Sequence, residues 1–394
     1  MISQETEERL AERLVKRIEK LDEFILETIG NRVKQIGTLK ATELHNIKQM
    51  LMYGKDLDAI KKYIAKVTNL NMKDITDIFE AEAKINQDFA KQYYLARGKE
   101  FIPYASNPLL QSQVKAIASI TMMEYMNISR TTAFMVDGKV TPLANAYQEL
   151  MDKAVTLISQ GKETYQELMR DTLNELAEKG IRTIDYNGTT RRLDSAVRMN
   201  MMDGMRTLTN ELQKQFAQEY GADGVEISAH GNPAPDHEDI QGRQFSTEEY
   251  EKLENGEIAK DYKGNIYDGA DRRHISTLNC YHKEFHIVLG VSKPLWTDEQ
   301  LNKIKEENQK GFEYNGKHYT MYEGTQLQRR IETEVRRQKE KQILGKASGD
   351  DTLVLASQSK ISQLNRKYKE LSLVSGLKMD KDRMRVNGYK RYKV

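Results

Sequence analysis

The sequence predicts an α+β fold with a mostly helical N-terminal half, a small mixed sheet domain in the middle and a basic helical C-terminal tail. Three observations lead to this prediction. Apolar residues recur at three- and four-residue spacing through most of the first 180 residues. Two short apolar runs, at 223–228 and 285–289, have the length and composition of neighbouring strands in one sheet. Lys and Arg outnumber Asp and Glu from residue 326 onward.

We place domain boundaries near residues 180 and 325. They separate a helical domain (1–180), an α+β domain (181–325) and a basic helical tail (326–394). The first helix is expected over 3–30, where apolar residues recur at three- and four-residue spacing with Glu, Lys and Arg between them. Further helices are expected over 42–53, 57–67, 72–97, 109–134, 142–158 and 164–179, with breaks at Gly54, at 69–71 and around Pro103 and Pro108.

The middle of the chain begins with a short β-like run at 182–186, and Asn187-Gly188 after it is a strong hairpin signal. A helix is expected over 193–220, with Gly221 as its C-terminal stop. The two strands that follow bracket a polar excursion, which we expect to contain an ordered hairpin.

Two local signals follow the second strand. Thr297 is predicted to cap a helix over 298–309. Asn315-Gly316 is predicted to form the turn of a hairpin within 312–319.

The tail carries 18 Lys and Arg against 8 Asp and Glu, a net charge of about +10 on a chain whose total is +2. We expect helices over 322–344 and 356–374, joined by a flexible polar linker at 345–351. Such a tail suits DNA or an acidic protein surface, although a solvated basic helix has the same composition. The expected contact residues are Arg329, Arg330, Arg336, Arg337, Lys381, Arg383, Arg385, Lys390 and Arg391.

The composition also excludes several classes of protein. With one cysteine, the chain has no internal disulfide framework, which favours folding in a reducing cytoplasm. The N-terminus is charged from residue 5 and lacks the apolar core of a secretory signal. No apolar run approaches the roughly 18 residues that a membrane-spanning helix needs, so no membrane is expected as a partner.

Residues 226–290 hold five of the seven histidines and the only cysteine. Four of these side chains are the ligand types of a tetrahedral zinc site: His230, His237, Cys280 and His282. Cys280 and His282 are separated by one residue and therefore point to the same face of an extended segment. Their spacing matches no standard zinc motif, so no cofactor is firmly expected, and zinc remains one alternative.

Two other interpretations apply to the same segment. The run Asp236-His237-Glu238-Asp239, or Cys280 with His282 or His274 as its base, would serve a hydrolase if the side chains converged. However, the sequence has neither a Gly-rich phosphate loop nor a GxSxG elbow. We favour a fold signature, in which the histidines and Cys280 form internal hydrogen bonds and Gly242 permits a tight turn.

An ordered set of motifs covers residues 190–394. The motifs are Arg192-Leu-Asp-Ser-Ala-Val-Arg198-Met, Ser228-Ala-His230…Asp236-His237…Gln241-Gly242, His274…Asn279-Cys280-Tyr-His282, Tyr319-Thr-Met-Tyr322-Glu…Gln326…Arg329-Arg330, and Lys381-Asp-Arg383-Met-Arg385-Val. This set resembles the phage minor capsid protein 2 family, which is related to the Mu F-like head morphogenesis proteins. One departure is Tyr281, because such proteins often have Arg after this cysteine.

The resemblance implies a structural minor capsid protein of a tailed bacteriophage, present in few copies near the portal vertex. It implies a Mu F-like domain at 181–325, a role in head assembly and in DNA packaging or delivery, and no enzymatic activity. The expected partners are the portal protein, the major capsid protein and packaged DNA. The expected location is the virion head, assembled in the cytoplasm of the host bacterium.

Two alternatives remain open at this point. One is a metal-dependent hydrolase or toxin-like module centred on His237 and Cys280. The other is a DNA-binding accessory factor that acts without a capsid.

Overall fold

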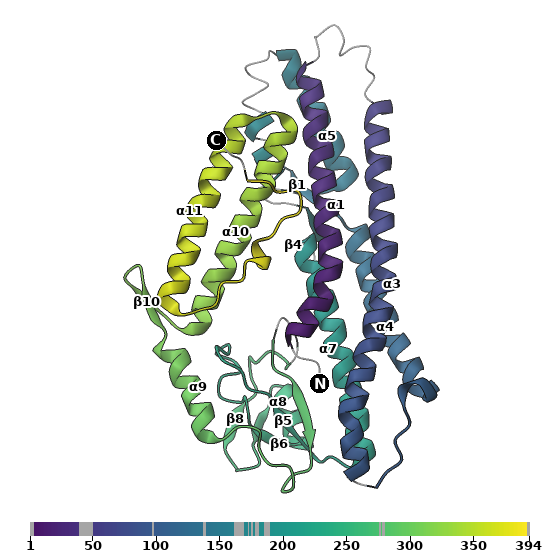
Figure 1. Ribbon diagram of the computed structural model, residues 1–394, viewed down its shortest axis with the longest axis vertical. Coiled ribbons are helices and arrows are strands. Elements are labelled where there is room, and N and C mark those ends of the chain that lie inside the picture. The colour runs from purple at the N-terminus through teal and green to yellow at the C-terminus, as the bar shows by residue number, and fades with distance from the viewer. Residues whose placement is uncertain are drawn as a thin grey trace.

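The protein is described by a computed structural model that covers residues 4–38, 50–96, 98–136, 139–160, 169–171, 173–174, 176–177, 181–184, 190–275, 277 and 280–391. The molecule is elongated, with long helices running side by side along its length, and the strands β5 (Gly224–Ile227), β6 (Gln244–Ser246) and β8 (Ile266–Asp268) lie at its lower end (Figure 1). This arrangement confirms the α+β, mostly helical fold class. The expectation of a mixed sheet was wrong, because every strand pairing in the described residues is antiparallel.

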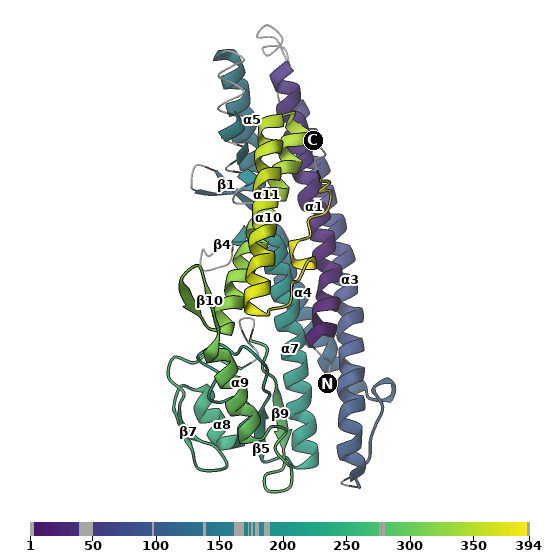
Figure 2. The ribbon, with the colours of Figure 1, turned by 60° about the vertical axis from the view of Figure 1, so that its left-hand side comes forward.

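Four helices form the main bundle: α1 (Gln4–Thr38), α3 (Met50–Ala96), α4 (Pro108–Arg130) and α7 (Leu193–Tyr220). They pack against one another and enclose one continuous apolar core. Helix α5 (Leu143–Gln160) contacts α1 and α3, and the turned view shows it in the upper part of the molecule (Figure 2). The short 3-10 helix η1 (Tyr104–Ser106) precedes α4 in the loop that contains Pro103.

The helix breaks expected at Gly54 and at 69–71 were wrong, because α3 runs without interruption from Met50 to Ala96. Asn71 explains the second error. Its side chain is fully buried, donates a 2.7 Å hydrogen bond to Tyr125 and accepts one of 2.9 Å from Arg17. These tertiary hydrogen bonds outweigh the weak helix propensity of asparagine. Of the helix expected over 42–53, residues 42–49 lie outside the described residues, as does most of 164–179.

Three helices of the bundle approach one another closely at Gly204 of α7. A Cβ atom at this position would overlap the Thr121 hydroxyl of α4 and lie 2.9 Å from Phe79 Cζ of α3. Only glycine fits this crossing without a shift of its neighbours.

A four-stranded sheet connects α5 to α7 in the order β2-β1-β3-β4. Its strands are β1 (Ala133–Val136), β2 (Lys139–Pro142), β3 (Arg182–Ile184) and β4 (Thr190–Arg192). Ile184 pairs with Thr190 across the predicted hairpin. The Asn187-Gly188 turn itself lies outside the described residues. The helix after this sheet has the predicted bounds, with Gly221 in the left-handed conformation at φ 78°.

The predicted strand pair forms the centre of a second sheet. Strand β5 (Gly224–Ile227) lies between β6 (Gln244–Ser246) and β9 (Glu284–Ile287), with Gly224 opposite Ile287. The polar excursion contains α8 (Thr247–Glu254) and the expected hairpin, formed by β7 (Ile258–Lys260) and β8 (Ile266–Asp268). These elements have a small core of their own around Phe245 and lie beside the lower end of α7 (Figure 1).

Both local signals after β9 are confirmed. Thr297 caps α9 (Asp298–Lys310) in a reciprocal capping box with Gln300. Strands β10 (Phe312–Tyr314) and β11 (Lys317–Tyr319) form the predicted hairpin. Asn315 and Gly316 adopt φ values of 51° and 73° at its turn.

The C-terminal part is a helical hairpin of α10 (Met321–Ser348) and α11 (Asp351–Ser375), followed by the 3-10 helix η2 (Asp382–Met384). The flexible linker expected at 345–351 was wrong, because two residues join the helices. Gly349 ends α10 in the left-handed conformation, and the Asp350 side chain accepts a hydrogen bond from Leu353 N to start α11.

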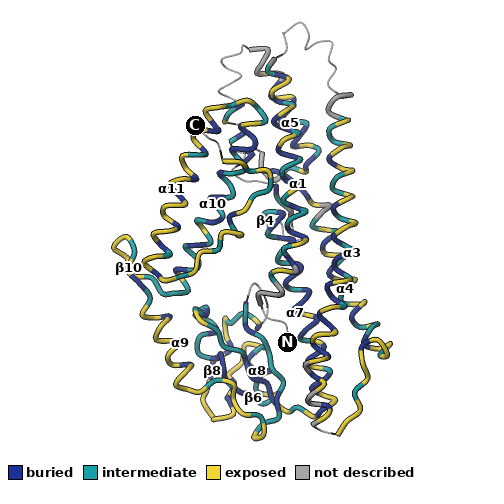
Figure 3. The backbone as a smooth tube through the Cα atoms, viewed as in Figure 1, coloured by how far each residue is buried: buried dark blue, intermediate teal, exposed yellow. Residues whose placement is uncertain are grey.

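Packing crosses both boundaries drawn from the sequence. The bundle core continues through α7 and takes in Ile343 and Leu344 of α10, which lies along α1. Much of α9 and α11 is exposed, whereas the bundle interior is buried (Figure 3). That the parts on either side of residues 180 and 325 fold independently therefore stays a prediction. Among the described residues, no helix combines the length and apolarity that crossing a membrane requires.

Candidate functional site

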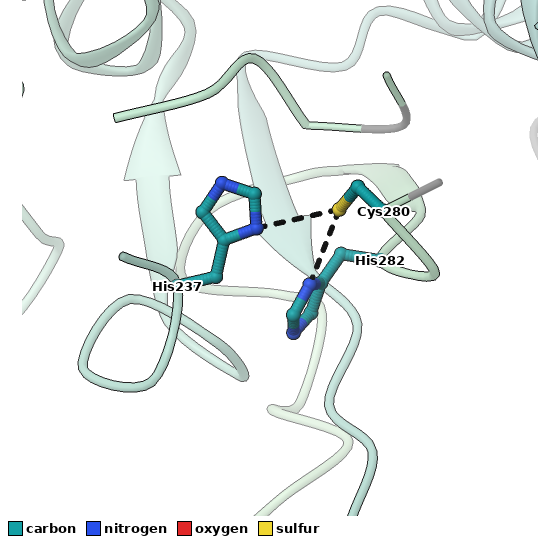
Figure 4. Close-up of side chains that lie close together, drawn as sticks. All are labelled: His237, Cys280 and His282. Atoms are coloured by element: carbon teal, nitrogen blue, oxygen red, sulfur yellow. Dashed lines mark hydrogen bonds between the residues drawn. The ribbon is translucent and has the colours of Figure 1, made fainter. Parts of the chain in front are cut away.

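The strand pair β5–β9 brings together three side chains that are distant in the sequence. His237 lies in the loop after β5, and Cys280 and His282 lie in the extended segment that enters β9. The Cys280 sulfur lies 3.3 Å from Nδ1 of His237 and 3.4 Å from Nδ1 of His282 (Figure 4). All three side chains are buried, with exposed fractions of 1%, 4% and 2%. We call these three residues the His-Cys cluster.

The outer nitrogen of each imidazole in the cluster faces a carbonyl oxygen. Nε2 of His237 lies 2.7 Å from the main-chain oxygen of Arg273, and Nε2 of His282 lies 3.2 Å from Oε1 of Gln241. The main-chain N–H of His230 donates to the same Oε1, which fixes the orientation of the Gln241 amide. A carbonyl oxygen only accepts, so each Nε2 carries the proton. In the neutral rings, both Nδ1 atoms therefore direct lone pairs toward the Cys280 sulfur.

His230, the fourth ligand predicted from the sequence, lies next to the cluster without joining it. Its ring lies against that of His282, with the centroids 4.2 Å apart and the planes tilted by 36°, and its Nδ1 lies 2.8 Å from the Gly231 carbonyl oxygen. His274, considered as a base for Cys280, instead lies exposed and pairs with Glu254 at 2.9 Å. The geometry therefore contradicts His274 as the base, whereas His282, the other base considered, does lie beside Cys280.

The two cluster histidines respond differently to their surroundings. Burial, together with His230 and His237, lowers the pKa of His282 far below its ordinary value, so this ring is neutral at physiological pH. Burial also acts to lower the pKa of His237. The Cys280 sulfur, the Arg273 carbonyl and Asp236 outweigh this effect and raise the pKa.

Of the acidic run around His237, only Asp236 approaches the cluster, with a carboxylate oxygen 3.6 Å from Nε2 of His237. Each carboxylate pairs with a different neighbour: Asp236 with Arg273, Glu238 with Asn308, and Asp239 with Arg272. These pairs fix the loop after β5 in place. The convergent acidic site that the hydrolase interpretation required is not formed by these residues.

Tyr281, which stands between Cys280 and His282 in the chain, lines two cavities. One, of about 410 Å³, is lined by the cluster and His230, and the other, of about 400 Å³, is lined by arginines of α7 and α10. The guanidinium carbons of Arg206 and Arg329 lie 5.7 and 5.9 Å from the centre of the Tyr281 ring. Arg329 also donates a 3.3 Å hydrogen bond to the Tyr281 hydroxyl. Tyr281 therefore joins the sheet domain to two helices. The residues near Tyr281 in the sequence did not indicate its contact with Arg206.

Four of the basic residues predicted to contact a partner form interactions within the chain. Arg329 binds Tyr281, Arg336 pairs with Asp194, Arg337 with Glu334, and Arg383 with Glu8 and Asp380. Burial acts to raise the pKa of Asp194, but Arg192 and Arg336 outweigh it and hold the pKa well below the usual range. The other five predicted residues are exposed: Arg330, Lys381, Arg385, Lys390 and Arg391.

The sequence prediction missed a group of basic residues on α11. Lys360, Arg366, Lys367 and Lys369 are all exposed. The signal was present in the helical periodicity, because the buried positions of α11 are Ile361, Leu364, Tyr368 and Leu371. We call these four basic residues the α11 basic group.

Comparisons with known proteins identify relatives of the whole chain. A family model described as phage minor capsid protein 2 matches residues 3–372. One curated relative, named "Structural protein" of Lactococcus phage LL-H, is 22% identical over 358 residues, which cover 88% of this chain and 90% of the relative. No solved structure is significantly similar to the chain.

Proposed function

This chain belongs to the phage minor capsid protein 2 family, as its motifs predicted, and we propose that it is a structural head protein located near the portal vertex of the virion. The observation that carries the proposal is the family match over residues 3–372. A relative named as a structural phage protein, aligned over most of both chains, supports it. In this role the protein acts in head assembly without catalysing a reaction.

The helical half is the part proposed to dock on the portal or major capsid protein. Helix α3 has 47 residues and would span about 70 Å at 1.5 Å per residue. On α4, Leu109, Ile120 and Met123 are 65%, 54% and 58% exposed. Their spacing of 11 and 3 residues places them on one face of the helix. Exposed apolar side chains along one helix face favour contact with another protein.

Particle incorporation tests this docking face. We expect a Leu109→Asp/Ile120→Asp variant to be lost from purified phage particles while remaining folded in the soluble fraction. The matched control is Leu373→Asp on α11, where the side chain is 74% exposed, and this variant should be incorporated normally. Normal incorporation of the α4 variant would contradict the proposed docking face.

The exposed basic surface is proposed to face packaged DNA. It consists of the α11 basic group together with Lys381, Arg385, Lys390 and Arg391. Salt dependence of DNA affinity tests this part of the proposal, because each phosphate contact contributes about 0.9 to the slope of log K against log salt. Replacing Lys360, Arg366 and Lys367 by Glu should make this negative slope less steep, reducing its magnitude by about 3.

The control for this experiment carries the same change of charge elsewhere. Lys303, Lys305 and Lys310 are exposed on α9, and their replacement by Glu should leave the slope close to that of the unmodified protein. If both triple variants showed the same slope of log K against log salt, the proposed contact between α11 and DNA would be contradicted.

A further inference from the structure

We propose that His237, Cys280 and His282 bind a zinc ion, and that the bound ion fixes Tyr281 at the junction between the sheet domain and the helical bundle. The inference goes beyond the proposed head function and does not depend on it. It rests on the positions of the ligand atoms, on the groups that orient them, and on the contacts of Tyr281.

The distances within the cluster suit a tetrahedral metal site. With Zn–S of about 2.3 Å and Zn–N of about 2.0–2.1 Å, tetrahedral geometry separates a sulfur and a nitrogen ligand by about 3.6 Å. The observed separations are 3.3 and 3.4 Å, and the three ligand atoms all lie within 4.8 Å of one another. An ion therefore fits after shifts of a few tenths of an ångström.

The surrounding groups orient the ligands as metal sites require. Each cluster imidazole donates from Nε2 to a carbonyl oxygen, of Arg273 or of Gln241, and presents the lone pair of Nδ1 to the sulfur. This second layer of acceptors is characteristic of metal-bound histidines. A thiol proton serves one of the two nitrogens at a time, whereas a metal ion accepts electron pairs from both nitrogens and from the thiolate. Two imidazoles and one thiolate form a ligand set that favours zinc.

All three proposed ligands line the 410 Å³ cavity, so a fourth ligand could reach the ion from it. Water can enter there, and His230 lines the same cavity with a buried Nε2 that has no hydrogen-bond partner among the described residues. The site thus has room for a fourth ligand without a change in the main chain.

Metal binding would act directly on Tyr281, because both of its chain neighbours are ligands. With Cys280 and His282 fixed, the Tyr281 ring stays beside Arg206 of α7 and Arg329 of α10. The ion would therefore stabilise both the entry to β9 and the contact between the sheet domain and the bundle.

Metal content of the full-length protein tests the site. Purified protein is loaded with zinc under reducing conditions, dialysed, and measured by elemental analysis. We expect about one zinc per chain, and, after exchange for cobalt, a thiolate-to-cobalt charge-transfer band. Cys280→Ala and His237→Ala should each lose the zinc and the band, whereas the control His274→Ala should keep both. Zinc well below one per chain in the unmodified protein, or full retention in Cys280→Ala, would overturn the assignment.

Two further measurements need no substituted protein. In the unmodified chain, a chelator should make the buried Cys280 thiol reactive toward a thiol reagent, and added zinc should restore its protection. Hydrogen exchange before and after chelation then tests the junction. We expect faster exchange in 280–287 and in the parts of α7 and α10 around Arg206 and Arg329. Faster exchange confined to the sheet domain would refute the role assigned to Tyr281.

Discussion

Replacing Gly204 by Ala tests the three-helix crossing at the centre of the bundle. In a helix interior, Gly→Ala ordinarily stabilises by about 1 kcal/mol. At Gly204 the added methyl group would overlap the Thr121 hydroxyl and lie 2.9 Å from Phe79 Cζ. Thr121 and Phe79 are 3% and 0% exposed, so neither side chain can move into solvent. Overpacking of this kind costs about 1–3 kcal/mol, so the net change should range from about zero to a loss of 2 kcal/mol.

Gly54→Ala on α3 is the matched control, because a Cβ atom there meets nothing within 4 Å. The control should gain about 1 kcal/mol from helix propensity alone. Subtracting the two changes in unfolding free energy, measured by urea denaturation, isolates the packing cost, which we expect to be about 1–3 kcal/mol. If both variants were stabilised equally, the close approach of α3, α4 and α7 at Gly204 would be refuted.

Three further predictions concern buried polar groups. Tyr125→Phe removes the hydrogen bond from the buried Asn71 amide and should cost about 1–3 kcal/mol in urea denaturation; an unchanged midpoint would contradict the account of α3. Burial raises the pKa of Glu284 from 4.5 to about 7, so its contribution to stability is complete below pH 4.5 and is lost as the pH rises through 7. Glu284→Gln should therefore flatten the pH dependence of unfolding across this window and be more stable than the unmodified protein at pH 8, whereas parallel profiles would contradict the assignment. Asp194→Asn removes the buried partner of Arg336 and should cost about 3–5 kcal/mol, and a loss below about 1 kcal/mol would show that the pair is dispensable.

Elements with local signals could be predicted closely from the sequence. The bounds of α7 followed from its periodicity and from Gly221, and the start of α9 followed from the capping residue Thr297. The Asn315-Gly316 turn followed from the left-handed conformations that these two residues tolerate. In each case the residues that determine the structure are adjacent in the sequence.

Elements that depend on distant partners could not be predicted in the same way. Asn71 indicated a helix break, but its amide is hydrogen-bonded to Tyr125, 54 residues later, within an unbroken helix. Gly345 indicated a linker, although it lies inside α10 and Gly349 ends that helix. Distant contacts accompany both positions, because a Cβ atom at Gly345 would lie 3.1–3.2 Å from Val354 and Leu353 of α11.

The candidate site was predictable in part. The sequence named His237, Cys280 and His282 among four candidate zinc ligands, and the structure brings these three together. The position of His230 beside the cluster was not determined by spacing. Nor could the sequence show that Arg206 would lie against Tyr281, because α7 is far from this segment in the chain.

We propose that this protein is a structural part of the phage head near the portal vertex. An asymmetric cryo-EM reconstruction of that vertex, from particles of the phage that encodes the chain, tests it most directly. We expect density for the long helices α3 and α4 beside the portal or major capsid protein, with the α11 basic group facing the DNA. Particles that lack the chain, or that carry it away from the portal vertex, would contradict the account.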